Sequence, residues 1–465
     1  METWLYYFTA PPALSLFGLV AALLVVSRDL RNRERPATSL AWVVAIIVVP
    51  LIAAPAYLLF GSRKLKRILR RSRGHRLRTQ ARHSGKALGT AQVLETYGLP
   101  PTRSGNSVRL FDDGVAAFEH LLDCISRAQH SIHIQTFILA TDTTGQAIVE
   151  ALARQAARGV EVRLLVDAVG SWRARLGLLR RVTRAGGHAA VFLPAFAFWR
   201  RGSANLRNHR KIAVFDGQCA LVGGMNLANE YMGPCASAER WIDTTSEYRG
   251  PVVGDVARVF ADDWAFATGE TLATPPSPPN PPRAAGACEL QTVPFGPDVD
   301  GDPLRDALTA AFYRARERIW ICSPYFIPDL ELTRVLEMQA RAGLDVRICM
   351  PRHSDSRIAD LVRDRSGRRL LAAGAQLYFH PSRMVHAKCV LVDHDIVVSG
   401  SANMDMRSMY LNFEIAMLAH DGRLTATTER WFESLMRDCD TGATPASGPL
   451  RRWSEDISWL ISPLL

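Results

Sequence analysis

Residues 209–216 read HRKIAVFD, and after six further residues positions 223–226 read GGMN. The same spacing returns later in the chain, where residues 386–393 read HAKCVLVD and, again after six residues, positions 400–403 read GSAN. A single His-x-Lys pattern is common in strands, but two copies of this long spacing in one chain are hard to obtain by chance. The duplicated stretch therefore predicts two equivalent structural units.

Each copy is interpreted as a β-hairpin that presents polar groups at one end of a sheet. Side chains alternate along a strand, so His209 shares a face with Lys211, and His386 shares a face with Lys388. The apolar residues that follow each lysine are expected to fill the sheet. Each hairpin is thus predicted to offer one imidazole and one ammonium group to the same site.

The remaining motif residues stand at the turns and after the return strands. Asp216 and Asp393 fall at the predicted turns, where we expect them to organise the hairpins and pair with nearby donors. The return strands end at Gly-Gly or Gly-Ser, where the backbone can approach a ligand closely. Asn226 and Asn403 follow there, and Ser401 precedes Asn403 by two positions.

This set of groups suits phosphoryl transfer from a diester. An imidazole can attack phosphorus or deliver a proton to a leaving alkoxide, because its ordinary pKa lies near neutrality. Ammonium and amide groups can hold the non-bridging oxygens as negative charge develops on them. Two hairpins supply two imidazoles, which are the nucleophile and the general acid that a covalent double displacement needs.

The elements around each motif also recur in the same order, with helix, strand, helix, glycine and strand preceding the hairpin. The first set is predicted at 114–127, 131–138, 146–158 and 160–166, and the second at 303–316, 319–327, 330–342 and 344–350. This internal repeat predicts a two-lobed α/β architecture. Between the two sets, residues 274–282 contain six prolines and are expected to form an extended linker.

The N-terminal region is typical of a membrane anchor. Residues 3–27 and 37–62 are uncharged runs of 25 and 26 residues, and about 20 residues suffice to cross a bilayer as a helix. They predict a helical hairpin, and the basic run at 63–73 favours a cytoplasmic location for everything that follows. The loop at 28–36 also carries four arginines, so a shallow or re-entrant first segment stays open.

The distribution of charge separates a lipid surface from a nucleic acid as the anionic partner. Residues 1–83 contain 14 of the 56 Lys and Arg residues and 3 of the 45 Asp and Glu residues, so the rest of the chain carries 42 of each sign. A nuclease is expected to carry its basic excess on the catalytic face. The neutral catalytic portion therefore favours anionic membrane lipids and argues against nucleic acid.

The eight cysteines form no C-x-x-C pair and no cluster typical of a metal site. Several lie in apolar strand patterns, where free cysteine behaves as a small hydrophobic residue. We therefore expect a reducing compartment for the catalytic part and no metal or other cofactor.

With two copies of H-x-K-x4-D, the chain resembles the phospholipase D superfamily. More narrowly it is similar to the bacterial cardiolipin synthases with two N-terminal membrane segments, through that membrane pair and through residues 404–408, 411–414 and 462–465, which read MDMRS, LNFE and SPLL. One departure is Gly224, which stands where many relatives have serine, whereas the second half keeps Ser401.

The resemblance implies an α/β fold of two similar lobes, each a mixed sheet flanked by helices, packed about a pseudo-two-fold axis with the active site between them. The expected segments are a membrane hairpin, a basic connector, a first lobe, a Pro-rich linker and a second lobe with a C-terminal tail. Their expected bounds are 1–62, 63–107, 108–270, 271–290 and 291–465. The location implied is the bacterial cytoplasmic membrane, as a multi-pass protein with both lobes on the cytoplasmic side.

The resemblance also implies a reaction. His209 would attack the phosphorus of one phosphatidylglycerol while His386 protonates the departing glycerol, and a second phosphatidylglycerol would then displace the histidine to give cardiolipin. Two acids with apolar or aromatic neighbours, Asp243 and Glu414, would orient His209 and His386 respectively. Lys211, Lys388, Asn226 and Asn403 would stabilise the charge on the transferring phosphoryl group.

Three alternatives stay open at this point. A phospholipase D hydrolase, or a transferase that uses another alcohol, would carry the same motifs because only the second nucleophile differs. A nuclease and a non-catalytic membrane scaffold are the others, and both are disfavoured by the residues described above. Neither the acceptor alcohol nor the oligomeric state follows from the sequence.

Overall fold

The computed structural model describes residues 89–193, 206–272 and 286–442, together with isolated positions at Ile46, Gly448, Arg451, Glu455 and Ser458. The predicted membrane hairpin at 1–62 lies outside the described residues apart from Ile46, and so does most of the predicted linker at 271–290. Within the described ranges, no helix combines the length and the apolar character that crossing a membrane requires.

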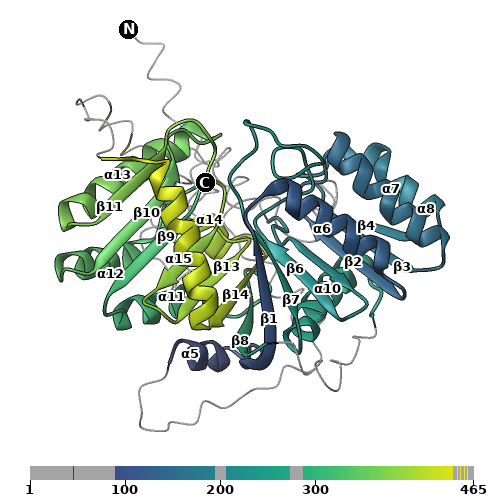
Figure 1. The fold of residues 1–465 in the computed structure, drawn as a ribbon, viewed down its shortest axis with the longest axis horizontal. Helices are drawn as coiled ribbons and strands as arrows, with labels where there is room; N and C mark the ends of the chain where they lie inside the picture. Colours follow the sequence, from purple (N-terminus) through teal and green to yellow (C-terminus); the bar gives the residue numbers. More distant parts are fainter. Residues whose placement is uncertain are drawn as a thin grey trace, which may run out of the picture. The chain divides into compact units, whose positions relative to one another are not determined.

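The strands form one mixed sheet of 15 strands, in the order β15-β11-β10-β9-β12-β13-β14-β8-β1-β7-β6-β5-β2-β3-β4 (Figure 1). In chain order the strands of the first half are β1 (Arg103–Phe111), β2 (Ser131–Thr136), β3 (Glu161–Asp167), β4 (His188–Phe192), β5 (Ile212–Phe215), β6 (Cys219–Gly223) and β7 (Thr245–Arg249). Those of the second half are β8 (Cys288–Phe295), β9 (Arg318–Cys322), β10 (Asp345–Pro351), β11 (Gln376–His380), β12 (Cys389–Val392), β13 (Ile396–Gly400), β14 (Glu414–His420) and β15 (Asp440–Thr441).

The described helices occur in two matching sets. The first comprises α6 (Gly114–Arg127), α7 (Thr143–Ala157), α8 (Leu178–Arg184) and α10 (Val252–Thr268), with α5 (Thr90–Thr96) before them and a short 3-10 helix at Ala174–Leu176. The second comprises α11 (Pro303–Arg314), α12 (Leu330–Arg341), α13 (Arg357–Ala373), α14 (Met406–Tyr410) and α15 (Gly422–Arg437). The predicted helices at 114–127, 146–158, 303–316 and 330–342 are confirmed, with ends that move by no more than three residues.

The strand order confirms the predicted repeat. Leaving aside the two-residue β15, the order reads the same from both ends, so that β2, β3 and β4 correspond to β9, β10 and β11. In each half these three strands run parallel, and the next three pair antiparallel. The halves join edge to edge through the antiparallel pair of β1 with β8.

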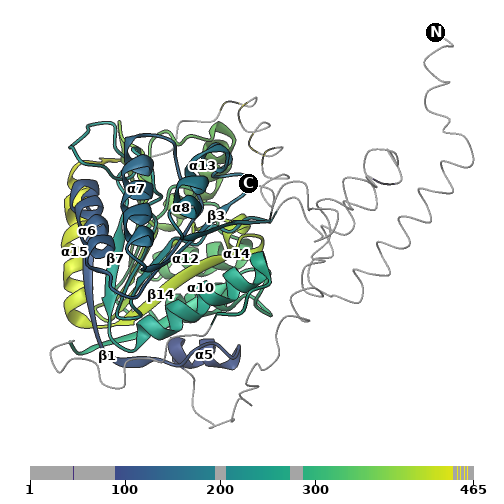
Figure 2. The same cartoon turned by 90° about the vertical axis from the view of Figure 1, so that its right-hand side faces the viewer.

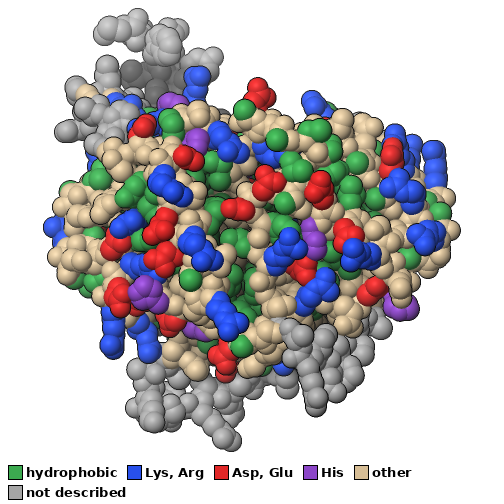
Figure 3. Space-filling model, viewed as in Figure 1, with side chains coloured by type: hydrophobic (Ala, Val, Ile, Leu, Met, Phe, Trp, Pro, Cys, Tyr) green, Lys and Arg blue, Asp and Glu red, His purple; other side chains and the backbone are tan. Residues whose placement is uncertain are grey.

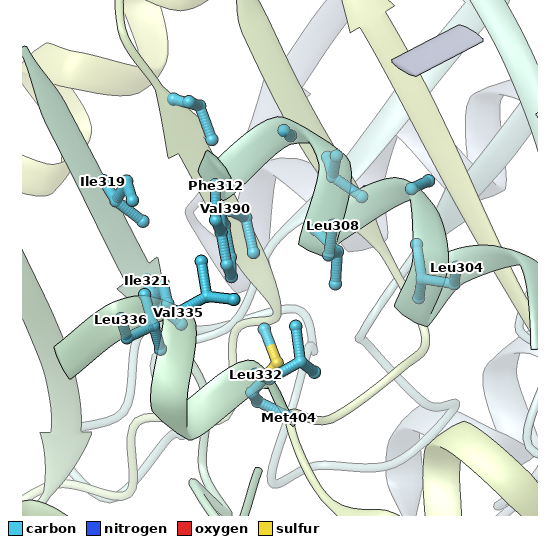
Figure 4. Close-up of a cluster of buried hydrophobic side chains, with 14 of the residues drawn as sticks. Leu304, Leu308, Phe312, Ile319, Ile321, Leu332, Val335, Leu336, Val390 and Met404 are labelled. Atoms are coloured by element: carbon cyan, nitrogen blue, oxygen red, sulfur yellow. The ribbon is translucent and has the colours of Figure 1, made fainter. Parts of the chain in front are cut away.

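Each half carries helices on both faces of its strands. In Figure 2, α6 of the first half and α15 of the second lie on one side, whereas α10 lies on the other. The outer core of the first half packs α6, α7 and α8 on β2 and β3, and that of the second half packs α11 and α12 on β9 and β10. Figure 4 shows the second of these cores, with Phe312, Ile321 and Leu332 among its side chains.

The alternation of side chains explains why both faces are apolar. In β5, Ala213 and Phe215 enter the outer core, whereas Ile212 and Val214 enter a central core that also holds α10, α15 and strands of both halves. Burial of both faces in this way favours the continuous apolar runs that follow the lysine of each motif. The predicted strand at 319–327 ends earlier, at Cys322, because Pro324 has no N–H to donate.

In each half, the duplicated motif begins at the edge formed by the carboxyl ends of the parallel strands, at Thr136, Asp167 and Phe192 in the first half and at Cys322, Pro351 and His380 in the second. Bridges of Asn208 with Phe413 and of Ile242 with Val385 bring these two edges together into one. Since β5 and β12 run antiparallel to β2 and β9, their amino-terminal ends lie at this same edge. We call it the strand-end edge.

Candidate active site

His209 and His386 both lie at the strand-end edge, just before β5 and β12 rather than within them. Each is fixed by the backbone of the other half. The N–H of His209 donates to the carbonyl of Phe413 over 2.9 Å, and the N–H of His386 donates to that of Ile242 over 2.7 Å. Parallel bridges of Asn208 with Phe413 and of Ile242 with Val385 accompany these bonds. The two motif segments are therefore cross-linked between the halves.

This crossing decides which acid orients which histidine. Nδ1 of His209 lies 2.9 Å from Oε1 of Glu414, and Nδ1 of His386 lies 2.6 Å from Oδ2 of Asp243. The predicted assignment, Asp243 to His209 and Glu414 to His386, is therefore wrong. Because Phe413 and Ile242 pair with the opposite half, the acid next to each of them stands beside the other half's histidine.

The two acids are held by different groups, and this explains the Gly-Gly and Gly-Ser difference. Oγ of Ser401 donates to Glu414, and the N–H of Ile415 donates to Ser401 over 3.0 Å. In the first half a Cβ on Gly224 would come within 2.2 Å of Oδ1 of Asp243. Asp243 thus fills the space that a serine side chain would need, and the N–H of Thr244 donates to it over 2.7 Å instead.

The His209–Glu414 pair has a neutral imidazole and an ionised carboxylate. Burial lowers the pKa of His209 to about 4, although the charge of Glu414 opposes the shift. Burial acts to raise the pKa of Glu414, but His209, Lys211 and the hydroxyl of Ser401 together hold it below its ordinary value. Near neutral pH His209 can therefore offer an unprotonated Nε2 while the carboxylate accepts the proton on Nδ1.

The His386–Asp243 pair is different. Burial raises the pKa of Asp243 to about 7, with Lys388 opposing the shift, and burial together with Lys388 and Lys211 lowers the pKa of His386. Both members of the pair thus disfavour their charged forms, so the pair retains a proton near neutral pH. Tyr231 and Trp241 enclose this imidazole, with ring centroids 5.1 Å from it.

The lysines are buried beside the histidines as predicted. Nζ of Lys211 donates to the carbonyl of His209 over 2.8 Å, and Nζ of Lys388 lies 2.8 and 3.1 Å from the two ring nitrogens of His386. Burial lowers the pKa of Lys211 to about 7 and that of Lys388 to about 8. A bound phosphodiester would favour the ammonium form of both.

The two asparagines differ in their surroundings. Oδ1 of Asn226 accepts from the N–H of Ile138 over 3.1 Å, which ties it to the end of β2. Oδ1 of Asn403 is buried and has no hydrogen-bond partner among the described residues. An unpartnered buried acceptor at this position suits a group that a substrate brings.

Asp216 and Asp393 do not contact the imidazoles. The carboxylate of Asp216 accepts from the N–H groups that open β2, and that of Asp393 accepts from those that open β9, which confirms the expectation that they organise the hairpins. The donors are Gln129, His130 and Ser131 for Asp216, and Arg316, Glu317 and Arg318 for Asp393. Both aspartates have positive φ, 51° and 48°.

Three arginines near the site were not singled out from the sequence. Arg210 is fully buried between His209 and Lys211, and its guanidinium contacts Asp263 and Asp298. Arg207 and Arg407 come from different halves and act electrostatically on each other. Arg210 could have been recognised from its position inside the motif. Arg207 and Arg407 come together only in the folded chain.

Comparison with known proteins agrees with the resemblance to the phospholipase D superfamily. A family model described as cardiolipin synthase, phospholipase D-like domain, matches residues 121–264 and 308–436, and a phospholipase D-nuclease N-terminal model matches residues 17–62. Cardiolipin synthase 1 of Bacillus anthracis is 32% identical over 94% of this chain and 90% of its own length, and the same values hold for a cardiolipin synthase of Geobacillus sp..

Among solved structures, the phosphatidylserine synthase of Haemophilus influenzae superposes with a TM-score of 0.59 and 14% identity, over 81% of this chain and all of that one. At this level of identity the similarity concerns the fold alone. It places the two-halved sheet with the helices on its faces among known architectures.

Proposed function

The chain belongs to the phospholipase D-like cardiolipin synthases and is a phosphatidyltransferase, and we propose that it joins two phosphatidylglycerol molecules through a phosphatidyl-histidine intermediate. The observation that carries this mechanism is the exchanged pairing of the acids, His209 with Glu414 and His386 with Asp243. It leaves the Glu414 carboxylate ionised beside His209 and a proton on the His386–Asp243 pair, and a double displacement needs one pair of each kind.

In the first step, Nε2 of His209 attacks the phosphorus of the donor phosphatidylglycerol. A P–N bond forms, the P–O bond to the headgroup glycerol breaks, and the proton held by the His386–Asp243 pair goes to the departing glycerol oxygen. His209 is suited to the attack because its pKa of about 4 leaves it unprotonated, and because the carboxylate of Glu414 stabilises the positive charge that the ring acquires.

In the second step, the terminal hydroxyl of another phosphatidylglycerol attacks the same phosphorus. Its proton passes to the His386–Asp243 pair, the new P–O bond forms and the P–N bond to His209 breaks, which releases cardiolipin. In both steps the negative charge on the phosphoryl oxygens is stabilised by Lys211, Lys388, Asn226 and Asn403. Loss of one such donor is expected to lower kcat by about 10²-fold.

The same proposal includes attachment to the bacterial cytoplasmic membrane. Its segments are a membrane hairpin at 1–62, a connector at 63–107, and two lobes at 108–270 and 291–465 with a linker between them. The phospholipase D-nuclease N-terminal match at 17–62 supports an N-terminal segment of this family type. The neutral charge of the remaining chain fits a lipid partner better than a nucleic acid. On the face drawn in Figure 3, basic and acidic side chains are interspersed.

The distribution of exposed apolar residues supports the strand-end edge as the side that meets the bilayer. Of the six large hydrophobic side chains exposed in the described part of the chain, four follow parallel strands at this edge, namely Val169, Trp172, Leu330 and Ile358. Trp172 is 56% exposed, and the guanidinium of Arg173 lies 5.0 Å from its ring. An aromatic ring paired with a cation is typical of residues at head-group depth.

Trp172 is also close to the reacting groups. Oγ of the preceding Ser171 donates to the carbonyl of Phe137 over 2.8 Å, and the ring of Phe137 packs 4.9 Å from that of His209. The two remaining exposed residues, Tyr313 and Met338, lie in the last turns of α11 and α12, at the opposite edge.

The experiment that tests this function follows labelled phosphatidylglycerol with the purified full chain. Cardiolipin and glycerol are the expected products, in equal amounts. Phosphatidic acid as the main product would reject the synthase reaction and leave a phospholipase D hydrolase with the same site. A His209→Ala variant that retained lipid turnover would reject the catalytic role of the site altogether.

A further inference from the structure

The stretch between the end of β3 and the turn of the first hairpin contains no acidic residue. Positions 168–215 carry ten arginines and lysines and no aspartate or glutamate, whereas positions 352–392, the corresponding stretch of the second half, include three aspartates. In the chain after residue 83 as a whole, acidic and basic residues are equal in number. The repeat of the fold therefore does not account for this local excess of positive charge.

Helix α8 carries much of this charge on its outer side. Its apolar side chains are buried in the outer core of the first half, whereas its three arginines are exposed. Another exposed arginine stands shortly before the helix. We call the four side chains the α8 basic surface, and they are Arg173, Arg180, Arg181 and Arg184. Figure 3 shows basic side chains gathered over the part of the sheet where α7 and α8 lie.

The fold itself neutralises little of the α8 basic surface. Among the described residues, Arg180 and Arg184 have no ion pair. Arg181 approaches Glu150 at 3.5 Å, and both of these side chains are about half exposed, so water weakens their attraction. The surface therefore keeps most of its positive charge.

Helix α13, which connects β10 to β11 as α8 connects β3 to β4, shows that this charge is not needed for the architecture. Three of its arginines pair with carboxylates of the same half. The pairs are Arg363 with Asp360 and Asp364, Arg368 with Glu455, and Arg369 with Glu337. Since the two helices hold equivalent positions, the unpaired arginines of α8 indicate an anionic partner outside the chain.

The position of the α8 basic surface favours a lipid bilayer as that partner. Arg173 follows Trp172, which is exposed at the strand-end edge, and its guanidinium lies 5.0 Å from the indole ring. Helix α8 begins after this loop and has seven residues, so it extends only about 10 Å from the edge, on the order of one Debye length. A ring at head-group depth with arginines beside it is typical of a surface that meets anionic lipids.

We propose that the α8 basic surface binds the anionic head groups of the bilayer and docks the catalytic part of the chain with its strand-end edge toward the lipid. The inference rests on the proposed function and goes beyond it, because it makes activity depend on the charge of lipids that do not react. Phosphatidylglycerol and cardiolipin both carry negative charge, so substrate and product alike would promote docking.

The test measures how an anionic lipid that cannot react changes the activity. The full chain is reconstituted in phosphatidylcholine vesicles with limiting labelled phosphatidylglycerol and increasing dioleoylglycerol hemisuccinate, which has neither a phosphodiester nor a free hydroxyl. Each arginine near an anionic surface strengthens binding about 5-fold, so we expect lipid turnover to rise at least about 3-fold. The neutral methyl ester of the same lipid should have no such effect, and added salt should abolish the rise.

Replacing Arg180, Arg181 and Arg184 together by Gln should remove this response, whereas replacing them together by Lys should preserve it, because the charge is kept. The matched control removes the same charge from the opposite edge of the sheet, just before β9, at the end of α12 and at the start of α15, and should respond like the wild type. Its three exposed arginines, replaced together by Gln, are Arg316, Arg341 and Arg423.

A wild type whose turnover ignored the anionic lipid would overturn the inference, and so would an equal loss of response in the two Gln variants. Weaker binding of a DNA oligonucleotide by the α8 variant, without any lipid response in the wild type, would assign the surface to nucleic acid and also overturn it. Phosphatidic acid in place of cardiolipin would instead overturn the proposed function, and the charge response would still be measurable in that product.

Discussion

The guanidinium of Arg210 lies 2.9 and 3.1 Å from the two carboxylate oxygens of Asp298, 88 positions further along the chain. The same group lies 2.6 Å from Asp263 on α10, and its Nε donates to the carbonyl of Glu414 over 2.9 Å. Arg210 therefore joins the two halves at a point between His209 and Lys211.

Replacing Arg210 by Met should destabilise the fold strongly. The substitution would leave Asp263 and Asp298 as buried carboxylates without their cation, a situation that costs about 3–5 kcal/mol. We expect a marked fall in the thermal midpoint of the full chain in detergent. Arg154→Met, at an exposed position of α7, is the control and should leave the midpoint unchanged. Equal midpoints for the two variants would contradict the structural role of Arg210.

The roles of the two histidines can be separated with a substrate whose leaving group needs no proton. A p-nitrophenyl phosphatidyl ester releases a stable phenolate, so His386→Ala should retain most of the release step on this substrate while losing cardiolipin formation from phosphatidylglycerol by about 10²-fold or more. His209→Ala should lose both activities, because no P–N bond can form. Release of p-nitrophenolate is followed by absorbance, and the opposite result would exchange the two roles.

Gly224→Ser should impair the site although the second half of the chain has a serine, Ser401, at the equivalent position. The new side chain would meet Oδ1 of Asp243 and displace the carboxylate that holds His386. We expect kcat to fall by at least about 10-fold with little change in KM, because the proton donor is misplaced while substrate binding persists. Ser401→Gly is the companion variant, which loses the hydroxyl on Glu414 without adding any atom. Wild-type kcat in Gly224→Ser would disprove the clash.

Asp243→Asn should change stability in a way that depends on pH. The pKa of Asp243 is raised from 3.8 to about 7, so the folded state holds the proton more tightly than the unfolded state does. Stability is then fully present below pH 4 and declines as the pH rises to 7, by at most about 4 kcal/mol. The variant lacks this loss. Between pH 5 and pH 8 its thermal midpoint should therefore rise relative to that of the wild type, although its activity falls.

Glu414→Gln provides a control of the opposite sign. Its pKa is held below the ordinary value, so the carboxylate contributes stability that is present above that value and lost on acidification. The midpoint of this variant should lie below that of the wild type at pH 7, and the difference should shrink as the pH falls. Parallel pH profiles for the two variants would refute the different charge states of the two pairs.

Trp172→Ala tests the bilayer-facing edge. In vesicles of phosphatidylcholine and phosphatidylglycerol, the variant should show a KM raised about 5-fold or more at unchanged kcat, because an interfacial anchor is lost and the reacting groups are intact. On a short-chain phosphatidylglycerol below its micelle concentration the two proteins should be equal. Met338→Ala, which removes an exposed apolar side chain from the opposite edge, is the control. Equal loss in both variants would argue against a specific docking side.

Much of the fold follows from local pattern. The duplicated spacing identifies β5 with β6 and β12 with β13 as hairpins, and the helices before them are recognised from apolar periodicity and terminal glycines. The turn positions of Asp216 and Asp393 follow from the same spacing, although the N–H groups that bind their carboxylates lie 75 to 87 positions away in the chain. These features depend on residues that are close in the chain or repeated within it.

What could not be predicted depends on how the halves meet. From the family resemblance we expect Asp243 to pair with His209 and Glu414 with His386, but the bridges at Asn208–Phe413 and Ile242–Val385 exchange the partners. Arg207 and Arg407 are 200 positions apart, so nothing local to either of them announces the other. The site is assembled from contacts between the halves, and such contacts leave no periodic trace in one sequence.

The exchange of acids has a consequence for a chain that is still being synthesised. When the first half has emerged and folded, His209 has no carboxylate behind it, because Glu414 lies more than two hundred positions downstream. His209 gains this carboxylate only when the strands of the second half pack against the first. Under the proposed mechanism, a partly synthesised chain therefore lacks the carboxylate that supports the attack of His209 on a lipid.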